Sequence, residues 1–300
     1  MKNQYKRQDI FRCTHDAHGQ RGHHVSVYHT MHRKACFPDG CTYFRWKCHE
    51  LEHRRKCYRG YSHVGKNCPG CKYFDEEKFT RSLVKIDESG YNSFLDELHD
   101  FEEWLRDSQN REHWILATIR SVKPHIKKTL YGDASDPKSV HTHLLGYVIC
   151  FDETYIGNEH FEDLTYCIVG RDYQSRFKFQ KGDRMEFRGT LVLQEGRMVF
   201  QQIRQVNFTE KKQDVEYWTD SKSLVARSTG TMLAKQADKC IACDQGMLID
   251  VVEKNNNQEN LYHRIFCMQG MPSAAACTYD LSKEIYSSSC SNHFDQFKTR

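Results

Sequence analysis

Cysteine and histidine, the residues best able to hold a metal, are concentrated towards the two ends of this chain. It has 300 residues with 14 Cys and 17 His, and seven of the Cys and nine of the His lie within residues 1–72. A second group of cysteines lies beyond residue 239. Soft thiolate and imidazole ligands favour zinc or an iron–sulfur cluster over magnesium or calcium. The sequence therefore predicts two metal-binding modules that bracket a metal-free body.

The C-terminal cysteines form the clearer set. Cys240-Ile-Ala-Cys243 would place two thiolates on one tight turn, and Cys267 with Cys277 would supply two more from the far end of a hairpin formed by MLIDVVE and LYHRIF. This arrangement resembles a zinc ribbon, which implies a structural Zn²⁺. The second pair is more widely spaced than the roughly two to four residues usual in such modules, so Cys290 is an alternative to Cys277. A redox CxxC pair is a second interpretation, although no βαβ pattern surrounds it, and buried cysteines without metal are a third.

The N-terminal cysteines allow more than one metal. The strongest unit combines the turn Cys68-Pro-Gly-Cys71 with Cys48 and Cys57 upstream. Four thiolates spaced this widely suit either Zn²⁺ or a [4Fe–4S] cluster, and the ligand count does not decide between them.

Three more N-terminal cysteines remain outside that unit. A second zinc could be assembled from these cysteines and neighbouring histidines, but no spacing selects one set. The candidates are Cys13, Cys36, Cys41, His15, His29 and His32.

A short motif between the N-terminal cysteines suggests hydrolysis. His49-Glu50-Leu51-Glu52-His53 matches H-E-x-x-H and so resembles the zincin metalloproteases over five positions. On a helix, His49 and His53 would bind Zn²⁺ from one face, and Glu50 would act as the general base. The alternative is a charged helical turn between two cysteine ligands.

Charge is distributed unevenly along the chain, although the formal net charge is only +4. Residues 1–72 contain fifteen Lys or Arg and five Asp or Glu, whereas residues 73–112 contain five and twelve. The basic segment could bind phosphates with release of counterions. It could equally offset the negative charge of four thiolates around one divalent ion.

Hydrophobic patterns divide the chain into five predicted regions. Phe94, Leu98, Phe101 and Leu105 recur at helical spacing, which predicts an amphipathic helix with a packing face. Strand-like segments rich in β-branched and aromatic residues follow it, with turns at Lys181-Gly182-Asp183 and Glu195-Gly196 and a bulge near Gln201-Gln202. The predicted regions are a Cys/His-rich basic metal-binding module (1–75), an acidic helical connector (76–112), a β-barrel (113–210), a linker (211–235) and a zinc-ribbon-like module (236–300).

The central region resembles the OB-fold. The resemblance rests on KGDRMEFRGTLVLQEGRMVFQQIRQVNF, which contains a Lys-Gly-Asp turn, a strand interrupted by Gly189 and a Glu-Gly hairpin turn. We therefore expect an α+β, mainly β protein whose five-stranded OB-like barrel is flanked by the two cysteine-rich modules. OB-folds bind single-stranded nucleic acid or oligosaccharide on one sheet face. Residues of the matching types are Arg120, Lys123, Lys127, Lys128, Arg188, Phe200 and Arg204.

These observations together favour a zinc-containing protein that binds single-stranded DNA or RNA. Alternatives are an enzyme or electron carrier with an N-terminal iron–sulfur cluster, a zinc metalloprotease, and an adaptor with a protein partner. No P-loop, G-x-S-x-G elbow or G-x-G-x-x-G following a strand is present, which disfavours nucleotide-driven and hydride-transfer chemistry. Without a signal-like or membrane-spanning apolar run, we expect a cytoplasmic protein with reduced cysteines and no membrane contact.

Overall fold

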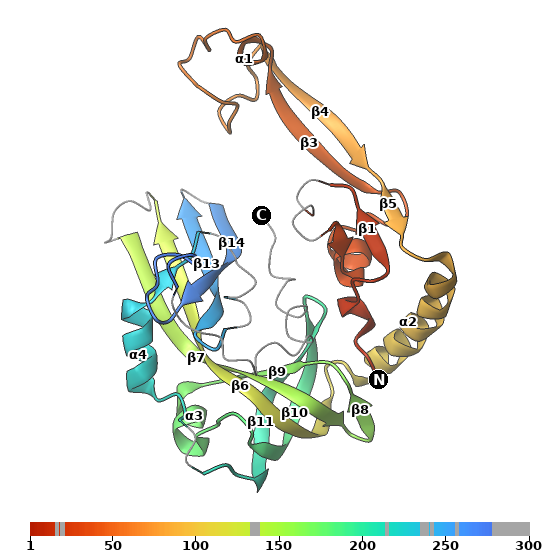
Figure 1. The fold of residues 1–300 in the computed structure, drawn as a ribbon, viewed down its shortest axis with the longest axis vertical. Coiled ribbons are helices and arrows are strands. Elements are labelled where there is room, and N and C mark those ends of the chain that lie inside the picture. The colour runs from red at the N-terminus through yellow and green to blue at the C-terminus, as the bar shows by residue number, and fades with distance from the viewer. Residues whose placement is uncertain are drawn as a thin grey trace. The chain divides into compact units, whose positions relative to one another are not determined.

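The computed structural model describes residues 1–15, 18, 22–132, 139–213, 216–234, 240, 243–255 and 258–277. The chain divides into two compact units (Figure 1): Gln4–His99, and Met1–Asn3 together with Asp100–Arg300. Within the described residues, no helix has both the length and the apolar character needed to cross a membrane.

The first unit contains a small sheet and a long two-stranded ribbon. The small sheet has the order β2-β1-β5, formed by His24–Val25, Phe11–Cys13 and Leu83–Lys85. The ribbon pairs β3 (Cys41–Cys48) with β4 (Phe74–Arg81) in antiparallel register, and the short helix α1 (His49–Glu52) lies at its far end (Figure 1). Further helical turns occur at Gln4–Lys6 and His29–Arg33.

Helix α2 (Glu88–Ser108) is shorter than the connector predicted from the sequence. The predicted packing face is confirmed, since Phe94, Leu98, Phe101 and Leu105 are all buried. The helix begins at Glu88, because the Asp87 carboxylate accepts the N–H groups of Ser89 and Gly90 and so caps its N-terminus. Residues 76–85 fall largely in β4 and β5, since pairing with distant strands overrides their local pattern.

The second unit contains a nine-stranded sheet in the order β12-β14-β13-β6-β10-β11-β9-β7-β8, and β6 also pairs with β7. The strands β6, β10, β11, β9 and β7 thus form a ring, although an uneven one, because β9 pairs with β11 over only Val199↔Tyr166 and Phe200↔Cys167. Their bounds are β6 Glu112–Tyr131, β7 Val140–Ile156, β8 Glu159–Phe161, β9 Thr165–Val169, β10 Arg184–Gln194 and β11 Arg197–Glu210. The five predicted strands are therefore present.

The β10–β11 hairpin has the predicted turn and irregularity. Its turn residues Glu195 and Gly196 both have positive φ, at 49° and 76°. The register shifts where Arg188 pairs with Arg204 and Thr190 pairs with Gln201, which places the bulge near the predicted position. Phe187 and Phe200 pack inside the ring with ring centroids 5.6 Å apart.

The C-terminal hairpin extends the sheet. Strand β13 (Gly246–Asn255) pairs with β14 (Gln258–Cys267) and adds in parallel to β6, so the predicted hairpin is present. The segment 211–235 is more than a linker, because it contains helix α4 (Asp220–Thr229) and strand β12 (Thr231–Met232).

Two helices accompany the ring. Helices α3 (Arg171–Phe177) and α4 both pack near β7, where the buried Tyr147 hydroxyl is 3.0 Å from both the Asp220 carboxylate and the Ser223 hydroxyl. The protein is thus a mainly β α+β protein with one large sheet.

Candidate metal centres and nucleic-acid interface

The four C-terminal cysteines predicted to bind metal line one small cavity of 30 Å³: Cys240, Cys243, Cys267 and Cys277. The turn at Cys243 suits a thiolate ligand, because the Gln245 N–H donates to its Sγ at 3.3 Å and the Gly246 N–H donates to its carbonyl oxygen at 3.0 Å. Cys290 lies outside the described residues.

Two glycines and a lysine shape this C-terminal site. A β carbon on Gly246 would lie 1.8 Å from the Cys240 carbonyl oxygen, so only glycine fits there. Gly270 repeats the turn by donating its N–H to the Cys267 carbonyl at 3.1 Å. The Lys123 Nζ donates to the carbonyls of Cys243 and Gly246 at 2.9 and 2.7 Å, which brings a positive charge beside the thiols.

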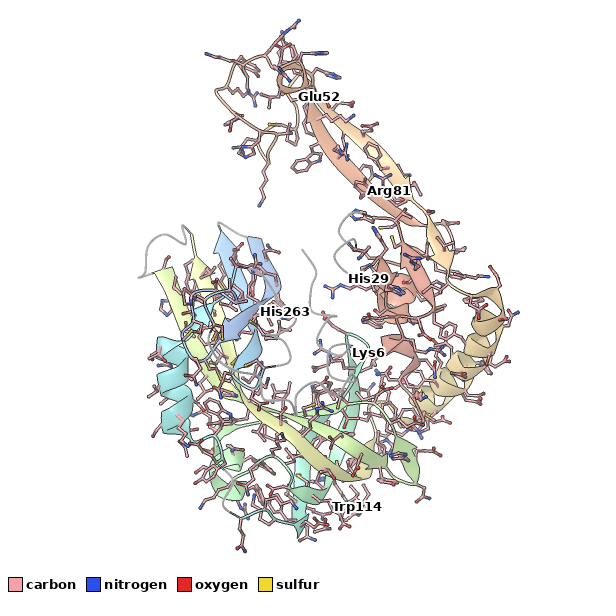
Figure 2. All side chains as sticks on the ribbon, in the orientation of Figure 1. Lys6, His29, Glu52, Arg81, Trp114 and His263 are labelled. Atoms are coloured by element: carbon pink, nitrogen blue, oxygen red, sulfur yellow. The ribbon has the colours of Figure 1, made fainter. Side chains whose placement is uncertain are left out.

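The predicted N-terminal quartet lies at the far end of the ribbon, where it lines a cavity of 10 Å³: Cys48, Cys57, Cys68 and Cys71. The Gly60 N–H donates to the Cys57 carbonyl at 2.9 Å, and the Gly65 N–H donates to the Cys68 Sγ at 3.4 Å. The N–H of Tyr73 donates to the Cys71 thiol and lowers its pKa, which favours the thiolate form. We call residues 49–73 the tip; Glu52 marks it in Figure 2.

The donor chemistry of both quartets fits zinc. None of the thirteen described cysteines forms a disulfide bond. Within the described ranges, no three His, Cys, Asp or Glu side chains are already arranged around one point as metal ligands. Four thiols facing one cavity, N–H groups aimed at sulfur and a glycine without room for a β carbon nevertheless match what a tetrahedral thiolate site requires. The same thiolates would suit an iron–sulfur cluster at the tip.

The H-E-x-x-H segment lies on the four-residue helix α1 and its C-cap. His49 and His53 are exposed, and neither lines the cavity of the tip cysteines. The Glu50 carboxylate pairs with the Arg55 guanidinium at 3.4 Å. This geometry favours the charged helical turn over a catalytic zinc site.

Two adjoining hollows lie in the second unit, and we call them together the cleft. Their volumes are 440 and 710 Å³, and both are lined by Ser121 and Lys123. Of the predicted nucleic-acid-binding residues, Arg120 and Lys123 lie here. The other basic and aromatic lining residues are Lys181, Arg197, Lys222, His125, His263, Tyr166, Phe179, Tyr217 and Trp218, and the acidic ones are Glu195, Glu216, Asp244 and Asp250.

The smaller hollow contains a charged cluster. The Asp250 carboxylate lies 3.6 Å from the His125 Nε2 and 3.0 Å from the His263 Nδ1 (His263 is labelled in Figure 2). Burial alone would raise the pKa of Asp250, but hydrogen bonds with these two imidazoles hold it well below its usual range. Burial lowers the pKa of Arg197 to about 10, which leaves this side chain charged at neutral pH.

A second row of candidate residues crosses the outer face of the ring. Arg188 pairs in register with Trp114 on β6 and with Arg204 on β11, and its guanidinium lies 5.4 Å from the centre of the Trp114 ring. Both arginines form ion pairs with Glu112, which reduces their combined charge. Trp114, labelled in Figure 2, is 45% exposed, whereas the next residue, Ile115, is buried. Because side chains alternate between the two faces of a strand, this neighbour is the signal that could have identified Trp114 as outward-facing.

The remaining predicted residues lie elsewhere. The expectation that Phe200 contacts nucleic acid is corrected by its burial. Strand alternation turns its side chain into the ring, where it is fully buried and offers no stacking surface. Lys127 and Lys128 lie where β6 pairs with β13, and burial lowers the pKa of Lys128. Neither lysine lines the cleft.

Sequence reasoning missed the residues that β11, β13 and β14 bring to the cleft. Arg197, Asp250 and His263 come from three strands, and only the folding of the C-terminal hairpin beside the ring makes them neighbours. A basic residue directly after the Glu195-Gly196 turn was the one local signal available.

Comparison of the chain with protein-family models, with curated proteins and with solved structures gives no match. The fold and the sites define a class in physical terms: a mainly β protein with two separate cysteine quartets and, beside one of them, a cleft lined by basic, acidic and aromatic side chains.

Proposed function

We propose that this protein binds single-stranded DNA or RNA in the cleft, and that Zn²⁺ bound by each cysteine quartet organises the surrounding structure. The observation that carries the proposal is the pair of adjoining hollows, which combine basic side chains with aromatic rings. Single-stranded nucleic acid is bound in this way elsewhere, with cations along the backbone and bases stacked on aromatic side chains.

The strand connections support an OB-like barrel as the framework. In chain order the ring runs first strand β6, second β7, third β9, fourth β10 and fifth β11, with α3 between the third and fourth. The third strand is parallel to the fifth, and the first closes the ring against the fourth. This is the connectivity of an OB-fold, whose ligands bind on the face of the second and third strands and at the loop between the fourth and fifth.

The smaller hollow lies on that same face. Val148 and Cys150 of β7 and Tyr166 and Ile168 of β9 line it, and Glu195 comes from the loop between β10 and β11. The apolar side chains and the Tyr166 ring provide a surface for a base, while Arg197, 5.7 Å from the centre of that ring, provides positive charge.

The larger hollow supplies the phosphate contacts. Arg120 and Lys181 line it from the first strand and from the turn before β10, and Tyr217 lies in the same wall. Lys222 is already paired with Glu216, so Arg120 and Lys181 are the stronger candidates for phosphate. The basic tip, with six Lys or Arg against two Glu in residues 49–73, would add non-specific affinity.

Zinc would act structurally in this proposal. The C-terminal quartet holds the carbonyls that Lys123 contacts, so metal bound there would fix a lysine that lines both hollows. A reducing, cytoplasmic compartment suits free thiols with this role.

Fluorescence anisotropy with labelled dT and rU oligonucleotides tests the proposal. The Arg120→Ala/Lys181→Ala variant should bind more weakly and show a salt dependence reduced by about 0.7 in slope for each lost phosphate contact. Tyr217→Ala should lose about 1–3 kcal/mol if a base stacks on it. Lys254→Ala is the matched control, because Lys254 pairs with Glu259 outside the cleft.

The competing surface is the outer row. If Arg188→Ala/Arg204→Ala weakened binding while Arg120→Ala/Lys181→Ala did not, the cleft would be the wrong surface. If the wild-type chain bound neither oligonucleotide, the proposed function would fail. Elemental analysis of anaerobically purified protein separates the metals, because about four irons per chain would favour the iron–sulfur enzyme or electron carrier instead.

A further inference from the structure

Three cysteines outside both quartets converge in the first unit, and we call Cys13, Cys36 and Cys41 the triad. Cys13 ends β1, Cys41 begins β3, and Cys36 precedes the turn between them. All three are buried, with exposures of 1, 8 and 9%. Cys13 pairs with Leu83 and Cys41 pairs with Arg81, so the two cysteines lie near each other, and Cys36 lies close enough to interact electrostatically with both.

The backbone around the triad repeats features of the two quartets. The His15 N–H donates to the Cys13 thiol, as the N–H of Gln245 does to Cys243 and that of Tyr73 does to Cys71. In each case the donor is the second residue after the cysteine.

A glycine also closes the turn of the triad. The Gly40 N–H donates to the Cys36 carbonyl at 2.6 Å, and a β carbon at Gly40 would lie 2.5 Å from the Arg81 carbonyl oxygen. A cysteine carbonyl bound by a following glycine recurs at Cys57, Cys243 and Cys267.

Imidazoles lie next to the triad, and we call His15, His18 and His29 the histidine row. The His18 ring centroid is 5.8 Å from that of His15 and 5.2 Å from that of His29 (His29 is labelled in Figure 2). The His15 ring also lies 4.3 Å from the Tyr43 ring, two residues beyond Cys41. The row therefore begins beside two of the three cysteines.

Buried free cysteines usually serve as small apolar side chains. Three of them from separate stretches of chain, with an N–H aimed at one sulfur and imidazoles beside them, offer the donor set of a structural zinc site. We propose that the triad, with one imidazole of the histidine row, binds a third metal ion, a Zn²⁺ in a Cys₃His site. Binding draws the ligands into a tetrahedron that they have not yet formed.

Such a site joins two parts of the first unit. It links β1 of the small sheet to the start of the ribbon through the Cys36 turn. This inference is independent of the nucleic-acid proposal, since no triad residue lines the cleft.

Native mass spectrometry of the full chain, expressed with added zinc, measures the ions bound per folded molecule. The Cys36→Ser/Cys41→Ser variant should carry one zinc fewer than the wild type. Cys167→Ala is the matched control, because Cys167 is fully buried and belongs to no cluster; it should retain the wild-type number. The test depends on the difference in zinc content between wild type and variant. It is therefore valid whether or not both quartets are occupied.

A second measurement, made on the wild type, tests the proposal even if the double variant fails to fold. Cobalt can replace zinc in thiolate sites, and the intensity of its thiolate-to-cobalt absorbance reports how many thiolates bind each ion. The spectrum of the cobalt-loaded wild type should therefore fit one Cys₃His site together with Cys₄ sites. Equal zinc content in wild type and the double variant would overturn the proposal. A cobalt spectrum from Cys₄ sites alone would do the same.

Discussion

The two cysteine quartets use similar turns on very different supports. Cys243 and Cys267 flank a hairpin whose side chains enter a core shared with β6, including Met247, Ile249 and Phe266. Residues 49–73, all of which the structure describes, contain no buried side chain. Similar ligand turns can therefore either add to an existing hydrophobic core or take the place of one.

The difference follows from what each chain segment can bury. The C-terminal hairpin removes several large apolar side chains from water, and each such side chain contributes about 1.5–3 kcal/mol. The tip has no comparable burial to offset the conformational entropy of its residues. We therefore expect the tip to depend on metal for its structure and the C-terminal hairpin to survive without it.

Metal removal should affect the two quartets most differently. With about 10–16 kcal/mol of binding free energy typical of structural zinc, chelation should unfold the tip completely. Hydrogen exchange should then show unprotected amides across residues 49–73 and persistent protection in β13 and β14. Two single variants should separate these outcomes: Cys68→Ser should unfold the tip, whereas Cys243→Ser should leave β13 and β14 protected. Equal loss of protection in both regions would show that the supports do not differ.

Two turn glycines, Gly246 beside the C-terminal quartet and Gly60 in the tip, differ in the space around them. Gly246→Ala places a β carbon 1.8 Å from the Cys240 carbonyl, so the turn must open and the C-terminal zinc should be lost. In Gly60→Ala nothing lies within 4 Å of the added β carbon, so the only cost is the positive φ of +79°, about 1–2 kcal/mol. This variant should therefore keep its zinc. Both variants are compared with the wild type by their zinc content and by the midpoint of thermal unfolding. Retention of all zinc by Gly246→Ala would contradict the close approach.

Lys123 offers a smaller effect. Lys123→Met removes two charged hydrogen bonds to the carbonyls of Cys243 and Gly246. Loss of such supporting contacts typically lowers metal affinity about 10–100-fold. Competition with a chromophoric chelator measures the change, and Lys66→Met, at an exposed position of the tip, is the control. An unchanged zinc affinity would mean that the lysine does not support the site.

The smallest effect is a pH dependence in the sheet beside the C-terminal quartet. The pKa of Asp250 is lowered in the folded state, so its contribution to stability is present above the unfolded pKa of about 3.9 and is lost as the pH falls towards the folded pKa. Urea unfolding of wild type and Asp250→Asn should therefore converge below about pH 4. The carboxylate is 36% exposed, which limits the difference. A difference independent of pH would rule out this contribution.

Local patterns predicted much of the fold. The apolar stripe of α2 and the bulged β10–β11 hairpin both follow from residues close in sequence. The strand β4 and the helix α4 were missed because a distant partner or a cap, rather than periodicity, fixes them. The Thr219 hydroxyl that caps α4 lies in a segment whose composition resembles a linker.

The candidate sites could be predicted only in part. The CxxC turns indicated cysteine quartets whose members do share cavities. The triad could not be selected from spacing, because Cys13 meets Cys41 only through pairing of β1 with β5 and of β3 with β4. The same limit applied to the cleft, where Arg197, Asp250 and His263 come from separate strands.

The ribbon β3–β4 has one further consequence. A two-stranded ribbon alone is marginal in water, and it frays from whichever end is open. Strand β3 starts at Cys41 and finishes at Cys48, so a cysteine of a different cluster stands at each end. If the proposed metal ions bind at both clusters, neither end of the ribbon is free to fray, and its strands stay paired over their length of roughly 25 Å.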